Sequence, residues 1–140
     1  MPATVGRRTP AYCSAVGKAM LAFMTEPALE EVLARQSLRA CTDKTLVTRG
    51  SLLADLRQVR IRGYSVDDEE IEKGLRCVGA PVWNCSGEVV AAMSIAGPAF
   101  RIMKGRVPAI ARAVIAATRS LSAELGYRQA ADDGLQSSMR

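Results

Sequence analysis

Apolar side chains recur every three or four residues in four stretches of the chain, and this period predicts four helices. They cover residues 12–24, 25–36, 51–61 and 107–125. Ser14 is the expected N-cap of the first helix, and Pro27 is tolerated because it falls in the first turn of the second. Gly63 and Gly126 stop the third and fourth helices, since glycine is common directly after a helix.

Between the third and fourth helices the pattern changes to that of strands. Residues 64–66, 75–84 and 88–95 read as strands, and a glycine-containing loop joins the last two into a hairpin. Pro81 lies inside one of these runs and indicates an edge strand or a bulge, because proline donates no ladder hydrogen bond. The acidic run 67–72 predicts a solvated connector. This order predicts an α+β domain with an antiparallel sheet and helices on one or both faces.

The composition is that of a globular protein, with 49% hydrophobic and 24% charged residues. No apolar run reaches the roughly 18 residues of a membrane span, and no signal peptide opens the chain. We therefore predict a cytoplasmic protein with no membrane partner. We also expect residues 1–9 to form a linker or leader, residues 10–127 the domain, and residues 128–140 a flexible tail.

The net charge of +5 is concentrated near the C-terminus. Residues 1–100 carry 12 basic and 11 acidic side chains, whereas residues 101–140 carry 7 and 3. Since few aromatic residues accompany the basic ones, we interpret them as the solvated face of the last helix rather than a nucleic-acid-binding strip.

Two features of the composition restrict the chemistry. The chain has no histidine, which excludes Ser–His and Cys–His nucleophile pairs and argues against catalytic zinc. Its cysteines form no C-x-x-C pair, so the sequence predicts reduced, buried thiols with no metal and no cofactor. These cysteines are Cys13, Cys41, Cys77 and Cys85.

The start of the first helix is a candidate ligand site. If the helix begins at Ser14, the amides of Ala15, Val16 and Gly17 are unpaired donors, and their small side chains admit a carboxylate. The alternative is that these small residues only permit tight packing of the helix on a sheet.

Further candidates lie on the strands. Asp67 ends a short strand, where it either points into a cavity or belongs to a charged surface turn. Ser94 and Ala96 share one strand face, and Cys77 and Gly79 lie on the neighbouring strand of the hairpin. If these small residues face the same side, they leave a hollow for a small ligand; close packing against a helix is the alternative.

One ordered set of residues extends over most of the chain: Gly17-Lys18-Ala19, Leu56, Val59, Arg60, Gly63, Tyr64, Asp67, Glu69, Glu70, Gly74, Cys77, Ser94-Ile95-Ala96-Gly97-Pro98 and Arg101. With these residues in this order, the chain resembles the isocitrate lyase regulator (IclR) family of bacterial transcription factors, from about Arg8 to Tyr127. The resemblance implies a C-terminal effector-binding domain with a GAF-like fold, a curved antiparallel sheet flanked by helices. It also implies a DNA-reading winged helix-turn-helix that this chain does not contain.

The resemblance also implies where a small organic acid binds. By position, the effector would contact Ala15, Val16, Asp67, Leu75, Cys77, Ser94 and Ala96. Ala96 replaces a second hydroxyl found in some members, and Val16 is larger than the usual residue. An aromatic acid is therefore as consistent with the site as a two- or three-carbon oxoacid.

We predict a non-enzymatic sensor in which the carboxylate binds the amides of residues 15–17. Ser94 and Cys77 would fix its polar atoms, while Leu75 and Met93 close the apolar side. Binding would change the arrangement of subunits in a homodimer or homotetramer, and thereby DNA binding by the absent domain.

Two other functions remain open from the sequence. One is a dimerisation module with a vestigial pocket. The other is an enzyme with Cys13 or Cys77 as nucleophile, which would need Lys18, Arg76 or a helix N-terminus to lower the pKa of the thiol.

Overall fold

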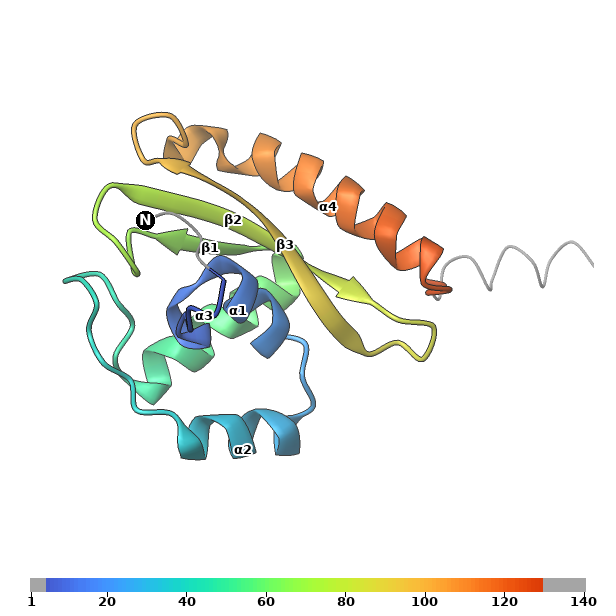
Figure 1. Ribbon diagram of the computed structural model, residues 1–140, viewed down its shortest axis with the longest axis horizontal. Helices are drawn as coiled ribbons and strands as arrows, with labels where there is room; N and C mark the ends of the chain where they lie inside the picture. The colour runs from blue at the N-terminus through green and yellow to red at the C-terminus, as the bar shows by residue number, and fades with distance from the viewer. Residues whose placement is uncertain (1–4, 130–140) are drawn as a thin grey trace, which may run out of the picture.

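The computed structural model describes residues 5–129, and these form a small antiparallel sheet with helices on both faces (Figure 1). The predicted helices and strands are all confirmed, although the first helix starts later because a 3₁₀ turn, η1, precedes it. Residues 130–140 of the predicted tail and residues 1–4 of the predicted leader lie outside the described residues. The elements are η1 (Ala11–Cys13), α1 (Ala15–Leu21), α2 (Glu26–Arg35), α3 (Arg49–Arg62), β1 (Ser65–Asp68), β2 (Leu75–Trp83), β3 (Val89–Pro98), η2 (Lys104–Arg106) and α4 (Val107–Glu124).

The sheet has the order β1-β2-β3, with both pairs antiparallel. Pro81 therefore lies on the central strand rather than on an edge strand. It is tolerated there because the pairing of β1 with β2 begins at Gly79, so β2 has a partner on only one side at Pro81. The register irregularity that the proline predicts is present, between Val82 and Trp83.

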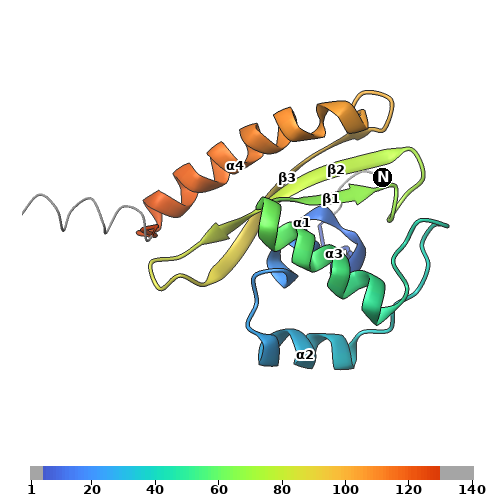
Figure 2. The same cartoon turned by 180° about the vertical axis from the view of Figure 1, so that it is seen from behind.

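The helices form separate layers on the two faces of the sheet (Figures 1 and 2). α4 covers one face, where Val78, Val107 and Ala111 form a buried cluster with Ile102. α1 covers the other face and packs in turn against α3, in a second cluster that includes Leu21 and other buried residues. These are Tyr12, Cys13, Ala22, Leu52, Leu56 and Val59.

Two glycines let α1 approach its neighbours closely. A Cβ atom added to Gly79 would lie 3.0 Å from the carbonyl carbon and oxygen of Ala15, so β2 and α1 meet without an intervening side chain. A Cβ atom on Gly17 would lie 2.3 Å from the carbonyl oxygen of Ala11. The first turn of α1 is therefore held between η1 and the central strand.

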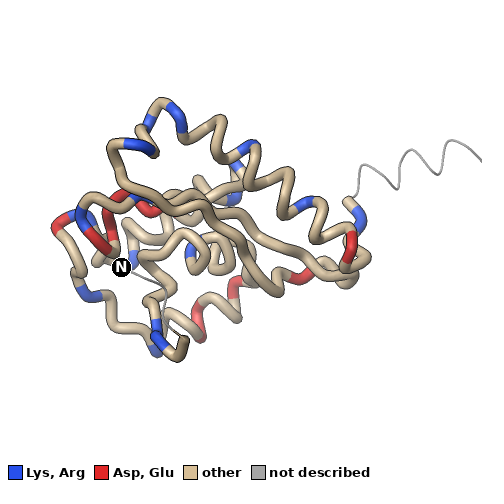
Figure 3. Tube along the Cα trace, turned by 45° about the horizontal axis from the view of Figure 1, so that its top comes forward, with Lys and Arg blue, Asp and Glu red and all other residues tan. Residues whose placement is uncertain are grey.

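The exposed face of α4 is basic, as predicted (Figure 3). Arg112 and Arg119 are exposed, while the buried stripe follows Val107, Ala111, Val114, Thr118 and Ser122. Leu121 and Leu125 lie outside this stripe and are exposed. In the described part of the chain, no helix combines the length and apolar character needed to cross a membrane.

Candidate functional site

Two rows of residues run across the sheet on the face that α1 covers. One row consists of Ser65, Gly79 and Ser94, and the other of Asp67, Cys77 and Ala96. Residues paired across antiparallel strands point to the same face, and the Ser65 Oγ donates a hydrogen bond to the carbonyl oxygen of Ala15. Both rows therefore face α1. We call the part of this face between Ala15, Cys77, Ser94 and Ala96, where the sequence predicts a ligand, the α1 hollow.

The structure thus brings together Ala15, Asp67, Cys77, Ser94 and Ala96, although their role in binding stays a prediction. The small side chains of Ser94 and Ala96 are exposed, because β3 is an edge strand in the described residues and α1 covers it only in part.

Leu75 is half-buried, and its pairing with Pro98 places it at the end of the same face. Val16 is 37% exposed at the first turn of α1.

Met93 does not belong to the α1 hollow. It pairs with Ala80, one position away from Ser94, and successive side chains of a strand point to opposite faces. The prediction that Met93 closes the apolar side of the site is therefore wrong: its side chain lies on the face that α4 covers and is 40% exposed.

The N-terminus of α1 offers fewer donors than predicted. The Ser14 side chain caps the helix by accepting a hydrogen bond from the Gly17 N–H at 3.1 Å, so Gly17 is not a free donor. The amides of Ala15 and Val16 have no hydrogen-bond partner within the described residues. These two N–H groups are the remaining donors in the first turn of α1.

Asp67 and Cys77 form a buried polar pair next to Ala96, in the second of the two rows. The Asp67 carboxylate accepts a hydrogen bond from the Glu70 amide at 2.8 Å and interacts with the Cys77 thiol. Burial raises the pKa of Asp67, although hydrogen bonds from the Glu70 and Ile71 amides oppose the shift. Asp67 is 1% exposed, so a ligand in the hollow would meet Cys77 first.

The two candidate nucleophiles, Cys13 and Cys77, are not activated. Burial, reinforced by the charge of Asp67, raises the pKa of Cys77 to about 12, and burial likewise raises that of Cys13 to about 12. Both thiols are therefore protonated at neutral pH, which is the opposite of what a nucleophilic cysteine requires. Cys41 and Cys85 are exposed, contrary to the prediction that all cysteines are buried, because they lie in the loops after α2 and β2.

The acidic run after β1 is not the solvated connector that the sequence predicted. Asp67 and Glu70 are buried, because the side chain of Lys18 reaches into this turn from α1. Its Nζ donates hydrogen bonds to Glu70 Oε2 at 2.8 Å, to Asp55 Oδ2 at 2.8 Å and to the Val66 carbonyl oxygen at 2.6 Å. Burial raises the pKa of Glu70, and Lys18 opposes that shift.

Lys18 is the buried polar residue that the sequence analysis missed. It is 1% exposed and lies on the stripe of α1 that also buries Ala15, Ala19 and Ala22. A lysine inside an apolar stripe, in a chain with an acidic run, is the signal that would have predicted the ion pair. In the described part of the chain, no cluster of three or more His, Cys, Asp or Glu residues could hold a metal.

Residues 1–123 match the family model described as bacterial transcriptional regulator IclR C-terminal. The chain belongs to the IclR family. It is 41% identical over 126 residues to the transcriptional repressor IclR of Escherichia coli strain K12, a match that covers 90% of this chain and 46% of that protein. The IclR-family domain described here thus spans about half the length of the curated relatives it matches, which are transcriptional regulators.

Solved structures confirm the α+β, GAF-like fold. The structure of Thermotoga maritima IclR matches with a TM-score of 0.87 and 34% identity, covering 91% of this chain and 51% of that one. The C-terminal domain of E. coli KdgR matches with a TM-score of 0.82 and 37% identity, covering 87% of this chain and 74% of that domain. The C-terminal position predicted from the sequence is therefore confirmed.

Proposed function

We propose that this IclR-family domain is a sensor that binds a small organic acid in the α1 hollow. Two observations together support the proposal. The backbone amides of Ala15 and Val16 have no hydrogen-bond partner within the described residues, and small residues on β3, the strand next to β2, are exposed. Ser94 supplies a hydroxyl on that strip, and the small side chain of Ala96 is exposed on the same face. In a site without arginine, a carboxylate can accept hydrogen bonds from backbone amides and from a hydroxyl group.

The floor of the hollow favours a weakly charged or partly apolar acid. Asp67 lies beside Cys77 on the neighbouring strand, and its negative charge disfavours an approaching carboxylate. Because burial raises the pKa of Asp67, protonation at lower pH removes this repulsion. Binding of a carboxylate that remains ionised should therefore strengthen as the pH falls.

In the intact regulator, binding would alter how an N-terminal winged helix-turn-helix domain reads DNA. This chain would take part as a homodimer or homotetramer, so that a change in one domain alters the spacing between two DNA-binding domains. The curated relatives, which are about twice as long as the match, support this proposal.

Isothermal titration calorimetry of the folded chain with two- and three-carbon oxoacids and with hydroxybenzoates tests the proposal. We expect saturable binding of at least one acid, and a loss of about tenfold in affinity in Ser94→Ala, since one hydrogen bond to a charged ligand is removed. Ser86→Ala, in the exposed hairpin loop, is the matched control and should bind as the wild type does.

Failure of every acid to give saturable heat with a folded sample would contradict the proposal. So would equal affinities of Ser94→Ala and Ser86→Ala, because the ligand would then lie elsewhere.

A further inference from the structure

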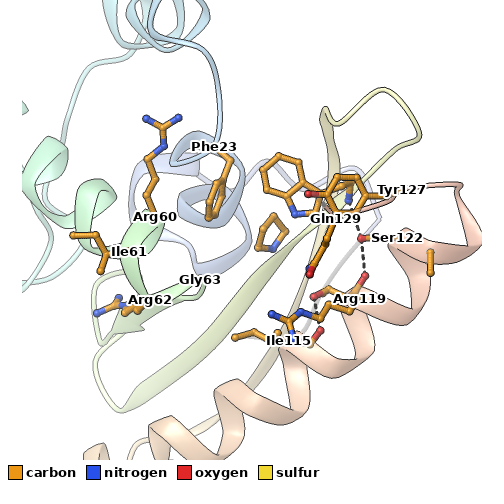
Figure 4. A pocket seen from close by; sticks show the side chains of 14 residues that line it. Phe23, Arg60, Ile61, Arg62, Gly63, Ile115, Arg119, Ser122, Tyr127 and Gln129 are labelled. Carbon is orange, nitrogen blue, oxygen red and sulfur yellow. Dashed lines mark hydrogen bonds between the residues drawn. The ribbon is translucent and has the colours of Figure 1, made fainter. Parts of the chain in front are cut away.

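A pocket opens where β2 extends beyond β1. Its volume is about 510 Å³, within the range of small-molecule sites, and it lies between the end of α3, the end of β2 and α4 (Figure 4). The gap exists because β1 pairs with β2 only up to Gly79, so no strand covers Pro81 and Trp83 on that side. None of the residues that bound the α1 hollow lines this pocket.

Aromatic rings form one wall of the pocket. The rings of Phe23 and Trp83 meet edge to face, with centroids 5.1 Å apart, and those of Trp83 and Tyr127 stack at 5.6 Å. Half of the six aromatic residues of the chain thus line one cavity. The wall is fixed in place, because the Ser122 Oγ on α4 accepts a hydrogen bond from the Trp83 amide at 3.0 Å.

The charged side chains that line the pocket are all arginines, and no described carboxylate lines it. Arg62 is engaged elsewhere: its Nε donates to the Tyr64 carbonyl oxygen at 2.8 Å, and its guanidinium lies over the Tyr64 ring. Arg60 points away from the pocket, whereas Arg119 extends from α4 into the space between Ile115 and Tyr127 (Figure 4). Within the described residues, Arg119 forms no ion pair or hydrogen bond through its side chain, so its guanidinium is available to a ligand.

We propose that this arginine–aromatic pocket, lined by Phe23, Trp83, Tyr127 and Arg119, binds a flat aromatic molecule that carries an anionic group. The ring packs against the aromatic wall, and the anionic group accepts hydrogen bonds from the guanidinium of Arg119. Arginine suits this role because its planar fork matches a carboxylate or a phosphate and also stacks on aromatic rings. The proposal does not depend on the function proposed for the α1 hollow.

The fluorescence of Trp83 reports on the pocket directly, because it is the only tryptophan of the chain. Benzoate and phenyl phosphate are the probes, and the tighter of the two identifies the preferred anionic group. Cyclohexanecarboxylate, whose ring is saturated rather than aromatic, and benzamide, which lacks the charge, are the matched ligand controls. We expect a saturable change with at least one aromatic anion and binding at least about tenfold weaker for both controls.

Variants locate the ligand. Arg119→Gln should weaken binding by at least about tenfold, whereas Arg112→Gln, which removes another exposed arginine of α4, should leave it unchanged. Ser94→Ala should also leave it unchanged, which separates this pocket from the α1 hollow.

No saturable change in emission at millimolar probe would overturn the inference. Equal affinities of Arg119→Gln and Arg112→Gln would also overturn it, as would loss of the signal in Ser94→Ala, because that signal would then arise from the α1 hollow.

Discussion

Substitution of Lys18 measures the cost of leaving a buried carboxylate without its cation. Lys18→Met replaces an ammonium that is 1% exposed by an apolar chain of similar length. The change leaves Glu70 and Asp55 without their cation. Asp55 is a quarter exposed on its side chain and can be solvated again, whereas Glu70 cannot. We therefore expect the free energy of unfolding to fall by about 3–5 kcal/mol, as when one partner of a buried pair is removed.

The stability lost in Lys18→Met should depend on pH and on whether residue 70 carries a carboxylate. Lys18 holds down the pKa of Glu70 against the effect of burial, so its removal raises that pKa further. The deficit of Lys18→Met is then largest above the ordinary carboxyl pKa and shrinks as the pH falls and Glu70 becomes protonated. Lys18→Met/Glu70→Gln should recover part of the stability at neutral pH, because no buried carboxylate is left unpaired.

Urea unfolding followed by circular dichroism measures these differences. Lys44→Met is the matched control: Lys44 also forms an ion pair, with Glu69 at 2.7 Å, but it is exposed and should contribute little. The reasoning is refuted if Lys18→Met loses no more than Lys44→Met, or if its deficit is the same at every pH.

Three further predictions concern packing, thiols and pH. Gly79→Ala should lower the free energy of unfolding by about 1–3 kcal/mol, because its Cβ would meet the Ala15 carbonyl at 3.0 Å. Gly50→Ala, in the open first turn of α3, should raise it by up to about 1 kcal/mol; equal effects in urea unfolding would contradict this. An aromatic disulfide reagent should modify Cys41 and Cys85 in the native protein and all four thiols after unfolding; rapid native reaction of Cys77 would contradict the assigned burial. The folded-state pKa of Asp67 is raised, so the stability that its protonated form contributes is fully present below its ordinary pKa of 3.8 and is lost as the pH rises. Asp67→Asn should therefore gain stability relative to the wild type as the pH rises. Asp68→Asn should lose stability over the same range, because hydrogen bonds from Arg76 hold the pKa of Asp68 low despite its burial; parallel pH profiles would contradict both statements.

The helices and strands could be predicted from the sequence because local rules agree with the fold along most of the chain. As the sequence indicates, Ser14 is the N-cap of α1, and Gly63 ends α3 as a left-handed C-cap with φ 85°. The period-two pattern also placed Ser94 and Ala96 on one face of β3.

Long-range contacts decide what the sequence could not predict. The acidic run after β1 is polar by composition, yet Glu70 is buried because Lys18, 52 positions earlier, reaches it. The free donors of α1 were overcounted because the Ser14 cap uses the Gly17 amide, a consequence of the same capping rule that identified the helix start. Met93 was assigned to the site for its apolar character, although strand alternation places it on the other face.

Of the two elements that flank the α1 hollow, α1 is held by contacts with more elements than β3 is. α1 is fixed by the hydrogen bond from Ser65, by the ion pair of Lys18 with Glu70 and by its close packing on Gly79. On the other side of the hollow, β3 has a hydrogen-bonded partner only in β2 among the described residues. A segment with fewer stabilising contacts changes its conformation at a lower free-energy cost. A ligand that enters the hollow should therefore change β3 more than α1, and this edge strand is the element through which binding could reach a neighbouring domain or subunit.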